Sequence, residues 1–75
     1  MDHVLFKQIR VTLGLGQVEF AEMLEISASY VAMIETGRRL ITPKIENKVR
    51  EEVDEELIQQ VDKLLNLRFV LESKK

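Results

Sequence analysis

The feature that most constrains the fold of this chain is a three-residue break between two short apolar repeats. Residues 17–24 and 28–36 each place apolar side chains at helical spacing, and only residues 25–27 separate them. A connection this short forces the second helix to cross the first steeply, so Ile26 must be buried beneath both, and small Ala21 suits the close approach. We therefore expect a tightly packed pair of helices in which the outer face of the second helix protrudes.

The ends of these two helices carry recognisable cap signals. Gly16 stands at the cap position of the first, and Glu19 is placed to reach back to its amide. Ser27 is a favourable cap for the second helix, and Gly37 follows it where a left-handed residue is expected.

Turn and cap signals divide the rest of the sequence into further helices. Asp2 is positioned to cap a helix over 2–13, and Thr42-Pro43 is a typical helix start. Asp54 is able to cap a fifth helix. Sustained polar–apolar alternation, the pattern of a strand, is absent before residue 65. The sequence therefore predicts an all-α, compact bundle of about five short helices.

Two parts of the C-terminal region have more than one interpretation. No glycine or proline separates the fourth and fifth helices, so they could form one long helix. Residues 65–71 alternate well enough for a strand, yet could also extend the helix. A helix is favoured up to about residue 65, and the residues after it could have an extended backbone.

Length and composition exclude several classes of protein. Seventy-five residues supply one small core, so oligomerisation is an expected supplement. The absence of cysteine excludes disulfides and thiolate zinc sites. No apolar stretch approaches the roughly 18 residues of a membrane span, and the N-terminus lacks the features of a signal peptide. We expect a cytoplasmic protein with no cofactor, no metal, no membrane association and no small-molecule substrate.

Charge is distributed unevenly along the chain. The formal net charge is −2, whereas nucleic-acid binders usually have a basic surplus. Between residues 38 and 50, however, five basic residues face a single acidic one, Glu46. The acidic run over 51–56 lacks the turn glycines and spacing of a metal site, and we interpret it as a solvated helix end.

The run LGQxxFAxxLxISxSYVxxIExGRR occupies residues 15–39. It resembles the Cro/repressor helix-turn-helix family, also called the xenobiotic-response-element family, and the resemblance extends over about residues 5–53. It implies a lambda-repressor-like, all-α DNA-binding domain in which residues 28–36 form the recognition helix, whose side chains enter the major groove.

The resemblance also implies roles for individual residues. The side chains expected to face the DNA bases, with Tyr30 at the edge of the groove, are Ser27, Ala28, Ser29, Tyr30, Ala32 and Met33. Those expected to contact phosphates are Gln17, Arg38, Arg39 and Lys44. Arg10 and Glu35 match a pair that ties the first helix to the end of the recognition helix.

Two residues depart from the family pattern. Glu25 stands where glycine is usual because the turn is left-handed, which costs a non-glycine residue roughly 1–2 kcal/mol. Gly16 replaces the usual serine or threonine cap, at a cost of only a few tenths of a kcal/mol.

The base-facing set has an unusual chemistry, because it contains no arginine, glutamine or asparagine, the side chains that discriminate bases by bidentate hydrogen bonds. Apolar contact with thymine methyl groups and two serine hydroxyls remain. The hypothesis is modest direct readout, with much of the specificity coming from DNA shape and half-site spacing.

We divide the chain into a helix-turn-helix DNA-binding domain over residues 1–53 and a C-terminal helix or tail over residues 54–75. Residues 57–71 hold more large apolar side chains than so small a core is expected to bury. Some must cover the domain's own core. A symmetric dimer contact is expected for the remainder, with the interface formed by Leu57, Val61, Leu64, Leu67, Phe69 and Leu71.

The leading functional hypothesis is a transcriptional regulator, a repressor or Cro-like protein, that binds a palindromic DNA operator as a homodimer. An antitoxin or restriction-system controller would use the same chemistry. An antirepressor or adaptor that binds protein through the same fold is the alternative from a different class. No nucleophile–base set is present, so we expect no enzymatic activity.

Overall fold

Five helices form the fold in the computed structural model, which describes residues 1–73 and, between 69 and 73, only the side chain of Leu71. No strand occurs in residues 1–73, and the all-α prediction is confirmed. The helices are α1 (His3–Thr12), α2 (Gln17–Leu24), α3 (Ala28–Glu35), α4 (Pro43–Glu52) and α5 (Glu55–Ser73).

Short-range hydrogen bonds begin these helices where the sequence predicts. The carboxylate of Asp2 accepts from the amide of Leu5 at 2.8 Å, and the Ser27 hydroxyl accepts from the amide of Tyr30 at 3.1 Å. At α2 the glycine cap has no side chain, and Glu19 reaches back to accept from the Gly16 amide at 3.1 Å. These contacts satisfy amides that lack partners within the helix.

The chain breaks between α4 and α5, so the alternative of one long helix is wrong. Val53 has an extended backbone (φ −115°, ψ 137°), and its side chain is buried in the core. Asp54 then caps α5, accepting from the amide of Glu56 at 2.8 Å. The break lets α5 turn back and pack on α1.

The ambiguous segment 65–71 is helical and belongs to α5. A strand there would need a neighbouring strand to satisfy its backbone amides and carbonyls, and none exists in residues 1–73. Within a helix the same groups are satisfied locally, so helix is the stable choice.

The core lies between α1, α2, α3 and α4, and the first part of α5 covers it. Its centre is an edge-to-face pair of Phe6 and Phe20, with ring centroids 5.1 Å apart. Ala21 is buried where α2 and α3 pack together, as expected, and Ile26 is half-buried against the core. The buried side chains are Leu5, Phe6, Ile9, Phe20, Ala21, Leu24, Val31, Ile34, Ile45, Val49, Val53, Ile58 and Val61.

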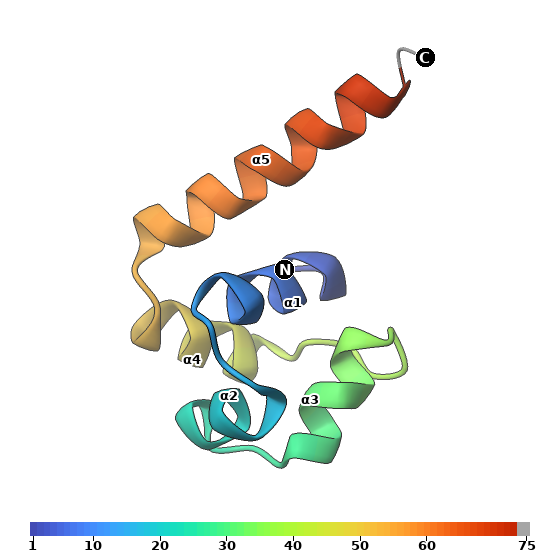
Figure 1. Ribbon diagram of the computed structural model, residues 1–75. Coiled ribbons are helices and arrows are strands. Elements are labelled where there is room, and N and C mark those ends of the chain that lie inside the picture. The colour runs from blue at the N-terminus through green and yellow to red at the C-terminus, as the bar shows by residue number, and fades with distance from the viewer. Residues whose placement is uncertain (74–75) are drawn as a thin grey trace.

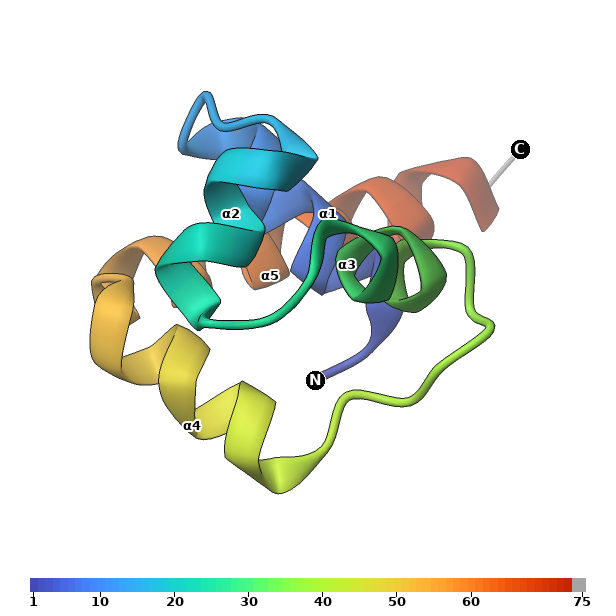
Figure 2. The same ribbon diagram turned by 90° about the horizontal axis from the view of Figure 1, so that it is seen from below.

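The five helices leave two distinct surfaces. α5 packs on α1, and its C-terminal half projects beyond the rest of the chain (Figure 1). Seen from below, α2, α3 and α4 face the viewer and α5 lies behind (Figure 2). The helix-turn-helix surface and the projecting helix therefore lie on different sides of the protein.

Candidate nucleic-acid interface

The turn between α2 and α3 begins at Glu25, whose backbone is left-handed (φ 60°, ψ 39°). The amide of Ile26 donates to the carbonyl of Ala21 at 3.0 Å and so closes the end of α2. Left-handed geometry costs a non-glycine residue roughly 1–2 kcal/mol. The turn therefore has the conformation expected from the sequence and keeps a strained residue at its first position.

The inner side of α3 is defined by Val31 and Ile34, which are fully buried. Ser27 and Ser29 are exposed on the outer side. The half-buried side chains are Ala28, Tyr30, Ala32 and Met33. We call the six predicted base-facing residues the reading face. It is open at its serines, whereas Ala28 and Tyr30 are partly packed against the core.

The loop after α3 places two arginines at the end of that helix. Gly37 has φ 79°, a left-handed conformation that glycine adopts without strain. The amides of Arg38 and Arg39 then donate to the carbonyl of Met33 at 2.8 and 3.2 Å. These bonds hold the backbone of both arginines against the last turn of α3, while both residues remain exposed.

The three cations predicted to contact phosphates have no ion pairs among the described residues. Arg10, Lys48 and Arg50 are each paired with a carboxylate. Arg38, Arg39 and Lys44 pair with none of the described residues, and outside this region the same holds for Lys7 and Lys63. Exposed cations without internal partners are available to an external anion such as a DNA phosphate.

Arg10 and Glu35 join α1 to the end of α3. The two side chains form a two-pronged contact, with Nε to Oε2 at 2.6 Å and Nη2 to Oε1 at 3.0 Å. Arg10 Nη1 also donates to the carbonyl of Leu15 at 2.8 Å. The hydrogen bond to Glu35 raises the pKa of Arg10, and the Glu35 side chain is only 3% exposed. The pair therefore fixes the position of α3 relative to α1.

Gln17, predicted to contact phosphate, is connected to the same pair. Its Nε2 donates to Glu35 Oε1 at 3.2 Å, a contact the sequence gave no reason to expect. An amide nitrogen carries two hydrogens, so one remains for a ligand on the exposed side. Gln17 is thereby oriented at the N-terminus of α2, where the backbone amides also favour an anion.

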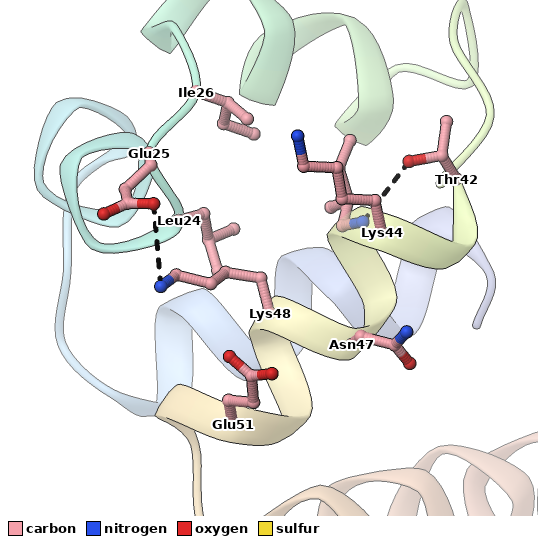
Figure 3. Close-up of a pocket in the computed structure, with 9 residues that line it drawn as sticks. Leu24, Glu25, Ile26, Thr42, Lys44, Asn47, Lys48 and Glu51 are labelled. Carbon is pink, nitrogen blue, oxygen red and sulfur yellow. Dashed lines mark hydrogen bonds and ion pairs between the residues drawn. The ribbon is translucent and has the colours of Figure 1, made fainter.

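An open hollow of about 530 Å³ lies between the α2–α3 turn and α4 (Figure 3). Leu24, Ile26 and Ile45 are among its lining residues, and Lys44 and Lys48 contribute to its rim. Lys48 Nζ lies 3.7 Å from a Glu25 oxygen and 3.5 Å from one of Glu52. These carboxylates, Glu25 foremost, raise the pKa of Lys48. Lys44 is thus the cation of this hollow that has no carboxylate partner among the described residues.

The predicted dimer residues of α5 fall into two groups. Val61 is buried in the core of its own domain and Leu57 is half-buried against it. Leu64, Leu67 and Leu71 are 65%, 54% and 59% exposed. The side chain of Phe69 lies outside the described residues. The two groups differ in exposure because successive residues of a helix point in different directions, so core-facing and outer positions are interleaved along α5.

Sequence reasoning missed a second ion-pair network. The Met1 ammonium lies 2.6 Å from a Glu46 oxygen, and Arg50 contacts both Glu46 (3.3 Å) and Glu55 (2.7 Å). The four-residue spacing of Glu46 and Arg50 on one helix signals the central pair. The other two contacts depend on how distant segments pack.

A short helix that shows its outer side between a strained turn and a pair of arginines is the geometry with which helix-turn-helix proteins approach a major groove. Residues 6–45 match the family model described as helix-turn-helix. This match spans more than half of the chain, and the chain belongs to that family.

Within it, the chain is a DNA-binding protein of the Cro/repressor type, the type that regulates transcription. No curated protein and no solved structure gives a significant match. Among the described helices, none has the length and apolar character required to cross a bilayer.

Proposed function

We propose that this chain is a transcriptional repressor or Cro-like regulator that binds a palindromic operator as a homodimer. The observation that carries the proposal is the position of Arg38 and Arg39, exposed and without carboxylate partners among the described residues, at the end of α3. Their charge lies at the opposite end of α3 from the exposed serines of the reading face. A regulator of this kind acts by occupying a promoter.

Phosphate contacts supply the affinity in this proposal. Gln17 lies at the start of α2, Arg38 and Arg39 follow α3, and Lys44 is in the first turn of α4. The phosphate contacts therefore come from both ends of the helix-turn-helix unit and hold α3 in register. Three cations per protomer, six per dimer, predict a slope of about −5 for log affinity against log salt.

Base recognition would depend on small and apolar groups. Ser27 and Ser29 offer hydroxyls that donate or accept, while Ala32 and Met33 offer apolar surface to thymine methyl groups. Such contacts discriminate less than bidentate arginine or asparagine contacts. Sequence-dependent DNA shape and the spacing of two half-sites would supply the remaining specificity.

The homodimer is supported by the exposed leucines of α5. Leu64, Leu67 and Leu71 lie on the projecting part of that helix, and a second copy would remove them from water. A symmetric dimer would present two reading faces to DNA about 34 Å, one helical turn, apart.

Selection of bound duplexes from a random pool is the direct test. We expect an enriched, two-fold symmetric sequence, and footprinting should protect two half-sites about one DNA turn apart. Enrichment of no sequence, together with protection that does not depend on sequence, would refute specific operator binding.

An adaptor that binds protein through the same fold is the second candidate. The net charge of −2 and the lack of arginine or asparagine on the reading face favour it. A gel shift with random duplex DNA at low salt separates the two candidates. An adaptor should leave DNA unretarded, whereas a DNA-binding regulator should retard it even without its operator.

A further inference from the structure

The outer side of α5 carries a continuous row of residues at alternating spacings of three and four. The row is Leu57, Gln60, Leu64, Leu67 and Leu71. This spacing keeps side chains on one side of a helix and is the pattern with which two helices pair side by side. Leu57 is half-buried against the core, whereas the three later leucines are more than half exposed. The row therefore begins in the domain and ends on the projecting half of α5.

An open hollow of about 460 Å³ adjoins the beginning of this row. It lies where the end of α1 meets the start of α5, and its lining residues are Thr12, Asp54, Glu56, Leu57, Gln60, Val61 and Leu64. A second hollow, of about 350 Å³, continues along α5 beside Leu64 and Leu67. One copy of the chain thus has a depression at one end of the row and a protruding leucine, Leu71, at the other.

We propose that α5 of a second copy occupies this surface in antiparallel orientation, with the two-fold axis between Leu64 and Leu67. In this arrangement the partner's Leu71 lies opposite Gln60 and fills the hollow at the beginning of the row. By symmetry, Leu71 of the first copy fills the same hollow of the second. The inference rests on the homodimer proposed above and specifies its geometry. A parallel pair would leave the hollow unfilled, because it brings Leu57 opposite Leu57, and that side chain packs on its own core.

Charge favours the same orientation. Residues 54–64 carry four acidic side chains and one basic, whereas residues 65–73 carry one basic side chain, Arg68, and one acidic, Glu72. Antiparallel pairing brings the acidic first half of each helix beside the second half of the other, whose charges balance, and parallel pairing would bring acid beside acid. The opposed helix dipoles add a small favourable contribution. Three exposed leucines per copy make a small interface, so we expect a weak pair that DNA stabilises.

Cysteine cross-linking tests the orientation directly, because the chain contains no cysteine of its own. Gln60→Cys and Leu71→Cys are made as separate variants of the full chain, one carrying a mass tag, and oxidised mildly without DNA. In the antiparallel pair, position 60 of one copy lies opposite 71 of the other. The 60–60 distance is then about 16 Å, beyond the roughly 7 Å that a disulfide spans. The mixed disulfide should form, and each variant alone should remain uncross-linked.

Gln59→Cys and Asn66→Cys are the matched controls, since both positions are exposed on α5 and lie off the row. Their mixture should cross-link much less than the 60–71 mixture. Homodisulfides in the single variants, or equal yields from the controls, would overturn the proposal. So would the absence of cross-links at protein concentrations where sedimentation shows a dimer, or a failure to detect any dimer at all.

The test is independent of DNA binding. Leu67→Lys should abolish the 60–71 cross-link and leave the helix-turn-helix core intact, because Leu67 is exposed. A wild-type chain that cross-links as expected but ignores DNA would refute the proposed function alone. A chain that binds its operator but forms the parallel cross-links would refute only the antiparallel pair.

Discussion

Glu35 Oε2 lies 2.6 Å from Arg10 Nε, although 25 positions of sequence separate the two residues. The contact joins the first helix to the last turn of α3. The same carboxylate accepts from Gln17 at 3.2 Å. One acidic side chain therefore connects a predicted phosphate contact with the helix that carries the reading face.

Glu35→Gln should destabilise the fold, because it leaves the Arg10 charge without its carboxylate partner in a largely buried position. Breaking one partner of such a pair costs about 3 kcal/mol or more, a large part of the stability of so small a domain. Thermal unfolding followed by circular dichroism measures the loss. The double variant Arg10→Met, Glu35→Leu should regain part of it, since no charge is then left unpaired. An unchanged midpoint in Glu35→Gln would contradict the role given to this pair.

Glu25→Gly should stabilise the protein, because glycine adopts the left-handed conformation without a steric penalty. The expected gain is about 1 kcal/mol, or about 4–8 °C in Tm for a domain of this size. The control Glu25→Ala removes the exposed contact with Lys48 but keeps the strained backbone, so its Tm should change little. If both variants lower the Tm equally, the contact with Lys48 matters more than the strain.

Arg38→Ala or Arg39→Ala should weaken DNA binding and make it less dependent on salt. One cation lost per protomer is two per dimer, so the log–log salt slope should become shallower by about 2. Fluorescence anisotropy across a salt series measures it. Neither arginine has an ion pair within the described residues, so unfolding should be unaffected. Lys7→Ala, at an exposed cation on α1, is the matched control and should leave the slope unchanged.

Replacing thymines of the selected operator by deoxyuridine should lower affinity where Ala32 or Met33 lies against the methyl group. A buried methyl is worth about 0.8 kcal/mol, which corresponds to about a fourfold loss for each contact. Binding assays with singly substituted duplexes identify the positions. Equal affinity for every substituted duplex would exclude methyl readout by this face.

Stability should fall in acid through Glu46. The hydrogen bond from the Met1 ammonium, and then the contacts with Arg50, lower the pKa of this carboxyl in the folded protein. The stabilisation is therefore complete above the ordinary pKa and is lost as the pH falls below about 4.5, through the lowered value. Denaturant unfolding at several pH values measures the trend. Glu46→Gln should flatten the dependence in this window, and an equally steep profile would assign the effect to other carboxylates.

Much of the fold is predictable because short-range signals specify it. Apolar spacing identifies the helices, and single cap residues such as Asp2 and Ser27 mark where they begin. The left-handed backbone at Glu25 was implied by the family resemblance, since glycine is usual at that position. The resemblance to a known family placed Arg10 opposite Glu35, which no local pattern would have indicated.

The features that escaped prediction all depend on which distant surfaces meet. Local signals allowed one long helix over α4 and α5, but the backbone is extended at Val53 and α5 turns back onto α1. Val61 and Leu64 are equally apolar, yet one packs inside and the other faces water. The bond from Gln17 to Glu35 likewise appears once α2 and α3 are packed together.

Periodicity and capping act over a few residues, so the amino-acid sequence alone is enough to specify the helices and the tight turn. The rotation of α5 about its axis, the partners of each charge and the set of cations left unpaired arise from packing between segments far apart in the chain. Burial free energy depends on the whole assembled surface, and no local pattern encodes it.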